Sequence, residues 1–169
     1  MKRFAIALSM LLSSGVALAA NGEPNFWGGI GAGAYTGKNY PPDAGSQEDP
    51  DHNHVGGYSI HGSLNFTGQQ ATFRIRQTAM FDFTSNRADE TAFEAGLPLA
   101  WQKKLWAAAG ISRLSDVSNS RKAPTVGFPV EIDYYPVRGL ELMVHANFNK
   151  DDNYVGFGIS GAIGRKRAE

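Results

Sequence analysis

Residues 138–149 read RGLELMVHANFN, and apolar and polar side chains alternate along this stretch. Leu140, Leu142, Val144, Ala146 and Phe148 share one parity, and Glu141, Met143, His145, Asn147 and Asn149 share the other. Successive side chains of a β-strand point to opposite faces, so the segment predicts a strand with one apolar and one mostly polar face. The same split recurs along the chain, which indicates an all-β protein.

Eight segments of this kind can be recognised. They span residues 26–37, 55–66, 70–83, 90–101, 104–114, 125–135, 138–149 and 153–164. The connections that follow the second, fourth and sixth segments are short, whereas the connection after the first segment, residues 38–54, is long and acidic. Short turns at one end and longer loops at the other are typical of outer-membrane barrels. We therefore predict an all-β fold, an eight-stranded antiparallel up-and-down β-barrel that crosses a membrane.

Residues 91–114 show the least regular pattern. Parts of this segment have helical propensity, but Gly96 and Pro98 would interrupt a helix. Pro98 also has no amide to donate to a strand neighbour, so a strand there needs an edge or a bulge. We predict two strands, with an irregularity at Pro98.

The first 20 residues have the composition of a secretory signal peptide. Lys2 and Arg3 precede an apolar stretch that ends in small residues with an A-x-A-like cleavage site. No later apolar run is long enough to span a bilayer as a helix. We expect a signal peptide over 1–20 and a single β-barrel domain over 21–169, located in the outer membrane of a Gram-negative cell.

Composition excludes several classes of function. Without Lys2 and Arg3, 14 basic and 16 acidic side chains remain, a formal charge of −2. This charge argues against a nucleic-acid partner, which requires a basic surface. The chain has no cysteine, which excludes disulfides, zinc–cysteine sites and thiol nucleophiles. We expect no cofactor.

Alternation alone does not decide which parity faces the inside of the barrel. The polar parity carries charges of both signs, and buried charges are tolerated when they are paired and hydrogen-bonded. We therefore predict an interior polar network of Arg74, Arg76, Glu94, Glu131, Asp133, Glu141, His61 and His145. An eight-stranded barrel has room for side chains or one small ligand, so a wide channel is not expected.

A soluble periplasmic barrel that binds a small apolar ligand is the alternative. In that protein Phe73, Ile75, Leu142 and Val144 would point inward around a cavity. The membrane interpretation instead expects aromatic residues near the strand ends to form girdles at the lipid boundary. These residues are Phe26, Trp27, Tyr58, Phe83, Trp101, Trp106, Tyr134, Tyr135 and Tyr154.

The long first connection contains the best sequence candidates for metal ligands. His52 and His54 lie two residues apart with carboxylates nearby, a combination that can bind a divalent metal. Nothing in the sequence holds these side chains in place, so a solvated acidic loop is the simpler interpretation. We therefore expect no metal site, with His52 and His54 as the weak candidates.

His61 and His145 lie on the polar parity and could serve a lipid-modifying enzyme. Their candidate partners are Ser59, Ser63, Glu131 and Glu141. No nucleophile motif accompanies them. Two histidines that are hydrogen-bonded inside a polar network are therefore the simpler interpretation.

Residues 133–140, DYYPVRGL, and 153–160, NYVGFGIS, resemble the closing hairpins of small eight-stranded outer-membrane proteins, the OmpA-domain and OmpX-like group. This resemblance implies insertion by the barrel-assembly machinery, contact with outer-membrane lipid, and a structural, adhesive or protective role. The catalytic residues of lipid A deacylases and palmitoyltransferases among these barrels find no matching motif here. We therefore expect a non-enzymatic monomer.

Overall fold

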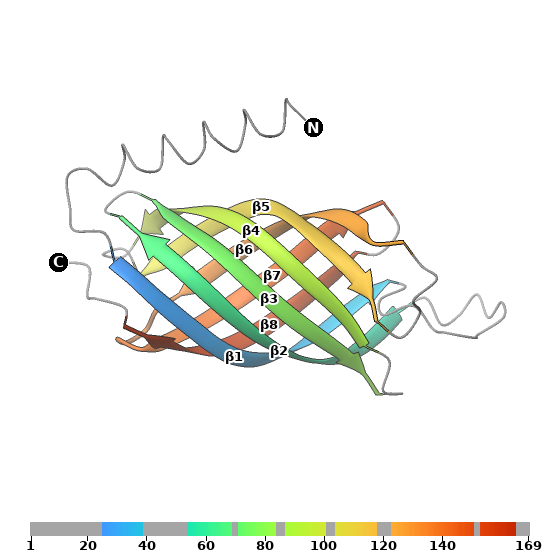
Figure 1. Ribbon diagram of the computed structural model, residues 1–169. Coiled ribbons are helices and arrows are strands. Elements are labelled where there is room, and N and C mark those ends of the chain that lie inside the picture. The colour runs from blue at the N-terminus through green and yellow to red at the C-terminus, as the bar shows by residue number, and fades with distance from the viewer. Residues whose placement is uncertain are drawn as a thin grey trace, which may run out of the picture.

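The computed structural model shows one closed antiparallel barrel in which each strand pairs with its neighbours in the chain and β1 pairs with β8 (Figure 1). The structure describes residues 25–38, 54–68, 71–83, 87–100, 104–117, 123–150 and 153–164. Its strands are β1 (Asn25–Lys38), β2 (His54–Thr67), β3 (Thr72–Asp82), β4 (Arg87–Ala100), β5 (Leu105–Asp116), β6 (Thr125–Tyr134), β7 (Leu140–Asn149) and β8 (Tyr154–Ile163). These ranges contain no helix that is both long and apolar enough to cross a bilayer.

The predicted strands and their up-and-down order are confirmed. The segment with mixed propensity forms β4 and β5, because pairing with β3 and β6 outweighs a weak local preference for helix. The register of β4 on β5 shifts between Pro98 and Ala100. This irregularity lies where proline cannot donate a ladder hydrogen bond.

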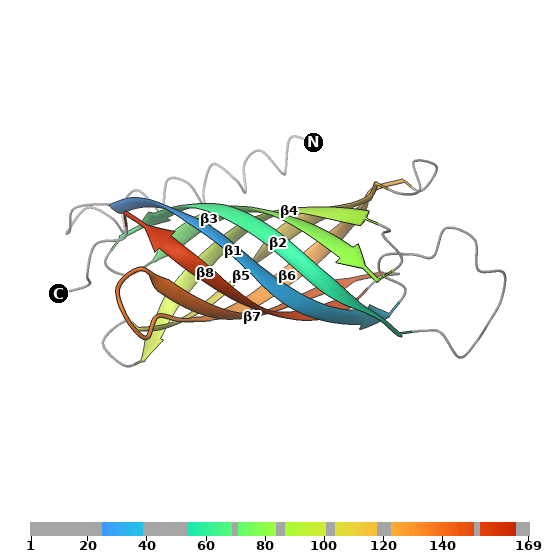
Figure 2. The same cartoon turned by 90° about the horizontal axis from the view of Figure 1, so that it is seen from below.

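The two ends of the barrel differ in their connections. We call the end with the β2–β3, β4–β5 and β6–β7 connections the turn end, and the opposite end the loop end. Figure 2 shows that β1 starts and β8 finishes at the turn end. The β6–β7 turn closes through Gly139, whose φ of 86° lies in the left-handed region that glycine adopts readily.

Two expectations fall outside the described residues. The signal peptide over 1–20 is one of them. The metal candidate is the other, because His52 and the side chain of His54 are not described.

Most large apolar side chains of the strands point away from the barrel axis. Leu64 is 70% exposed, and Ile75 and Val144 are each 49% exposed. Phe73 and Leu142 lie on the same outward parity and are half-buried by their neighbours. The soluble alternative requires Ile75 and Val144 to line a cavity, so it is contradicted. The physical reason is that the polar parity already fills the inside.

Candidate functional site: a filled polar lumen

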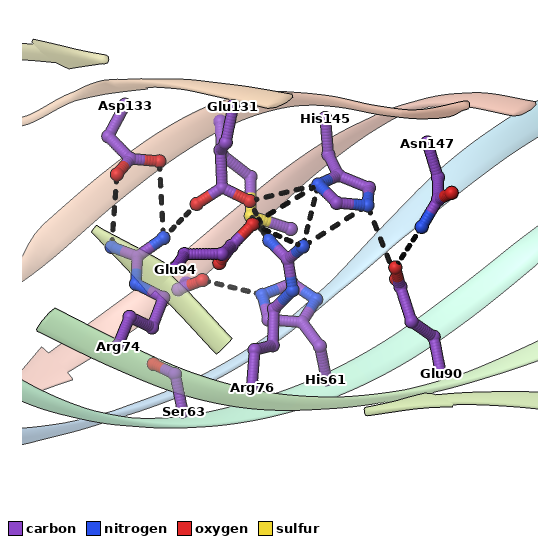
Figure 3. A network of polar contacts seen from close by, with 12 residues as sticks. His61, Ser63, Arg74, Arg76, Glu90, Glu94, Glu131, Asp133, His145 and Asn147 are labelled. Atoms are coloured by element: carbon purple, nitrogen blue, oxygen red, sulfur yellow. Dashed lines mark hydrogen bonds and ion pairs between the residues drawn. The ribbon is translucent and has the colours of Figure 1, made fainter. Parts of the chain in front are cut away.

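The inside of the barrel, which we call the lumen, is occupied by polar side chains that alternate with the outward apolar ones. All eight residues proposed from the sequence lie there, and each is at most 5% exposed. They come from different strands: His61 on β2, Arg74 and Arg76 on β3, Glu94 on β4, Glu131 and Asp133 on β6, and Glu141 and His145 on β7. Figure 3 shows most of them converging in one network.

Arg74 is the most heavily bonded side chain near the turn end. Its guanidinium contacts three carboxylates, one amide oxygen and one phenol. These partners are Glu131, Asp133 (Nη2 to Oδ2, 3.0 Å), Glu141 (Nη2 to Oε1, 2.7 Å), Asn65 (Nε to Oδ1, 2.6 Å) and Tyr135 (Nη2 to the hydroxyl, 3.1 Å). A buried charge of this kind is tolerable only because almost every donor finds an acceptor.

Arg76 lies one inward position further toward the loop end. It contacts Glu131 through Nη1, so Glu131 joins the two guanidinium groups. Its Nη2 lies 3.2 Å from Glu94 Oε1 and 2.6 Å from His145 Nδ1. Glu94 keeps its other carboxylate oxygen without a hydrogen-bond partner among the described residues. Glu131 is therefore the central carboxylate of the network, whereas Glu94 is peripheral to it.

The network continues toward the loop end through residues that the sequence analysis missed. His145 Nε2 lies 3.2 Å from Glu90 Oε2 and 2.8 Å from the Tyr154 hydroxyl. Glu90 is fully buried and also accepts hydrogen bonds from Tyr154 and from the Asn147 amide. Glu90 and Asn147 share the inward parity of Glu94 and His145, which was the signal that could have identified them.

His61 lies beside the network and has a different partner from those expected. Its Nε2 is 2.6 Å from Ser160 Oγ on β8, and its Nδ1 has no hydrogen-bond partner among the described residues. Room for the imidazole comes mainly from Gly31, where a Cβ atom would lie 2.7 Å from His61 Cε1, and also from Gly158, where that distance would be 3.2 Å. His61 and Ser160 are 3% and 2% exposed, so a substrate could reach them only if the barrel opened.

Clusters of buried aromatic and apolar side chains, which we call caps, lie toward the two ends of the lumen. The turn-end cap consists of Trp27, Trp106, Tyr135 and Ala162, and the loop-end cap of Tyr35, Met80, Ala88, Leu114 and Tyr154. Trp27 meets Tyr135 edge-on at 6.0 Å between ring centroids, and its indole nitrogen donates to Thr67 at 3.0 Å. The ionic network lies between these two caps.

The predicted outer girdle is therefore wrong for four of its residues. Trp27, Trp106, Tyr135 and Tyr154 are each at most 5% exposed and face the lumen, because they lie on the inward parity. Phe26, Tyr58 and Phe83 do face outward, at 74%, 50% and 84% exposure, and Tyr134 is half-buried on the outer face. Trp101 lies outside the described residues.

Two groups of lumen residues have the composition of metal sites. They are Glu94, Glu131 and His145, and Glu131, Asp133 and Glu141, with ligand atoms within 4.8 Å of one another. Arg76 contacts members of the first group, and Arg74 contacts members of the second. The guanidinium groups thus supply the positive charge that a metal ion would bring.

Solved structures of small membrane barrels share this architecture. The chain is similar to neisserial surface protein A, with a TM-score of 0.56 and 12% identity over 85% of this chain and 100% of that one. It is also similar to a designed transmembrane β-barrel, with a TM-score of 0.54 and 12% identity over 84% and 98% of the two chains. No protein-family model and no curated protein sequence matches the chain. These similarities show the fold, that of a small eight-stranded transmembrane barrel.

Proposed function

We propose that this protein is a non-enzymatic outer-membrane barrel whose lumen is a rigid polar plug and whose role is structural or surface-interacting. One observation carries the proposal: most large apolar side chains face outward, while the ionic network is buried inside between the two caps. A water-soluble barrel has the opposite distribution, because exposed apolar belts aggregate in water. The plug leaves no role in general diffusion.

The difference between the two ends of the barrel indicates its orientation in the membrane. The short connections of the turn end would face the periplasm, and the loop end would face the outside, as is usual in outer-membrane barrels. The first connection, residues 38–54, would then meet external partners. Outer-membrane lipid would surround the barrel, the barrel-assembly machinery would insert it, and the protein would act as a monomer.

Fractionation, electrophoresis and bilayer recording together test this proposal. We expect the mature protein in the outer-membrane fraction, with different gel mobility before and after boiling, because a closed barrel resists detergent until it is heated. In planar bilayers it should give no porin-sized conductance. Recovery of the protein in the soluble periplasm, or a steady large conductance, would contradict the proposal.

A lipid-modifying enzyme is the second candidate, and one contact favours it. The 2.6 Å approach of His61 to Ser160 is the arrangement of a histidine that activates a serine. Mass spectrometry of lipid A from cells without the gene, with the wild-type gene, with His61→Ala and with His145→Ala would test this candidate. If the lipid A profile is the same with and without the gene, the candidate is removed.

A further inference from the structure

The outer face of the barrel is not uniformly apolar. Outward positions on β6, β7 and β8 carry apolar or aromatic side chains or glycine. Among strand residues with described side chains, outward charges occur only on β4 and β5, at Arg87, Asp89 and Arg113. All three lie in the half of their strand that is nearer the loop end. Gln77 and Thr91 adjoin them, and we call these five residues the outer polar patch.

Strand register makes the patch continuous. Gln77 pairs with Thr91 across β3 and β4, and Thr91 pairs with Arg113 across β4 and β5. The Thr91 hydroxyl donates to Gln77 Oε1 at 2.6 Å, and the amide nitrogen of the exposed Gln77 has no hydrogen-bond partner among the described residues. Arg113 is exposed and makes no ion pair with any residue in the described ranges.

Arg87 is held against the surface of the barrel by two kinds of contact. It donates to both oxygens of Asp89, at 2.8 and 2.9 Å, and its guanidinium lies 5.7 Å from the centroid of the Phe81 ring. Phe81 in turn stacks on Tyr58 with 5.2 Å between centroids. Since Asp89 offsets Arg87, the patch carries a net positive charge that resides on Arg113.

The position of the patch relative to the outward apolar residues indicates what surrounds it. The next outward residues toward the turn end are Phe93 on β4 and Ile111 on β5, and both are apolar. An outward arginine costs about 2–4 kcal/mol at the bilayer midplane and about 0–1 kcal/mol near the interface. Arg113 therefore marks the height at which hydrocarbon gives way to lipid headgroups on this side. One guanidinium group can donate two parallel hydrogen bonds to the oxygens of a phosphate.

We propose that the outer polar patch binds the phosphate headgroup of an anionic lipid, with Arg113 as the principal contact and the Gln77 amide as a second donor. The acyl chains of the same lipid would lie along Phe93 and Ile111. This inference rests on the proposed insertion of the barrel in a membrane.

Native mass spectrometry of the full mature protein, folded in a neutral detergent, tests the inference. Phosphatidylglycerol and phosphatidylcholine are offered at equal concentration to wild type, to Arg113→Gln and to Arg138→Gln, an exposed arginine of the β6–β7 turn at the opposite end. We expect wild type and Arg138→Gln to retain phosphatidylglycerol preferentially. Arg113→Gln should retain about tenfold less, the effect of one hydrogen bond between charged groups.

Separate outcomes distinguish the inference from the proposed function. If wild type inserts into phosphatidylcholine vesicles but shows no preference for the anionic lipid, the inference is wrong and the proposed function stands. If it inserts into no vesicle, the proposed function fails first. Displacement of the lipid by an equal concentration of inorganic phosphate would overturn the lipid assignment. If wild type forms a dimer without bound lipid, and Arg113→Gln dissociates that dimer, a second copy of the chain occupies the patch. This result would also overturn the lipid assignment.

Discussion

The two halves of the lumen bury charge in opposite ways. Near the turn end, a cation is surrounded by anions: Arg74 contacts Glu131, Asp133 and Glu141. Near the loop end, an anion is surrounded by donors: Glu90 meets His145, Tyr154 and Asn147. The first arrangement depends on the attraction between one cation and several anions, and the second on hydrogen bonds. The free energy of unfolding should therefore change by different amounts when one partner is removed from each half.

Removal of Arg74 is expected to have the largest effect. Arg74→Met leaves the carboxylates around it without their cation and should lower the free energy of unfolding by about 3–5 kcal/mol. Urea titration of the barrel folded in vesicles, followed by tryptophan fluorescence, measures this. Adding Asp133→Asn and Glu141→Gln, whose ion pairs are with Arg74, should restore part of the loss. If Arg74→Met unfolds like wild type, attraction between Arg74 and its carboxylates is not what stabilises this half.

A matched pair of glutamates sharpens the comparison. Glu131 contacts both guanidinium groups and lies 3.2 Å from His145 Nδ1. Glu94 contacts one guanidinium group, at 3.2 Å, and lies 4.0 Å from the same His145 nitrogen. Glu131→Gln should therefore cost about 2–4 kcal/mol, and Glu94→Gln less than about 1 kcal/mol, in the same urea titration. Equal losses for the two variants would show that position in the network does not matter.

Two tyrosines of the loop-end cap supply the smallest and most specific test. The Tyr154 hydroxyl bonds Glu90 and His145, while the Tyr35 hydroxyl has no hydrogen-bond partner among the described residues. Tyr154→Phe should cost about 1–3 kcal/mol, because it leaves a buried carboxylate with one donor fewer. Tyr35→Phe should change the free energy of unfolding by less than about 0.5 kcal/mol. A larger loss for Tyr35→Phe than for Tyr154→Phe would show that the hydrogen bonds of Tyr154 do not stabilise this half of the lumen.

The number of strands could be predicted because a period of two is visible in short windows of sequence. The up-and-down order followed from the short connections at one end, and the inward parity from the charges of both signs that it carries. The same parity applies to Glu90 and Asn147, but Glu90 is the first residue of its predicted strand and Asn147 carries no charge. For Trp27 and Tyr135, nearness to a strand end predicts the girdle, whereas parity predicts the lumen. Each follows an outward aromatic residue, Phe26 and Tyr134, so it had to face the lumen.

Partners across the lumen could not be predicted in the same way. Arg74 and Glu131 are 57 positions apart, and His61 and Ser160 are 99 positions apart. Which inward side chains meet depends on the tilt and stagger of the closed barrel, and no local sequence pattern reports these. The sequence therefore indicated Ser59 and Ser63 for His61, whereas closure of β1 against β8 brings Ser160 to it.

The placement of both arginines on β3 has a consequence for biogenesis. Most of their carboxylate partners lie on β6 and β7, so a partly formed sheet that holds β3 without β6 and β7 carries ions that must stay hydrated. Water can leave the interior only when the missing strands have paired and the first and last strands join. Dehydration and closure are thus a single late event, and a partly assembled chain has no stable dry form in which to pause.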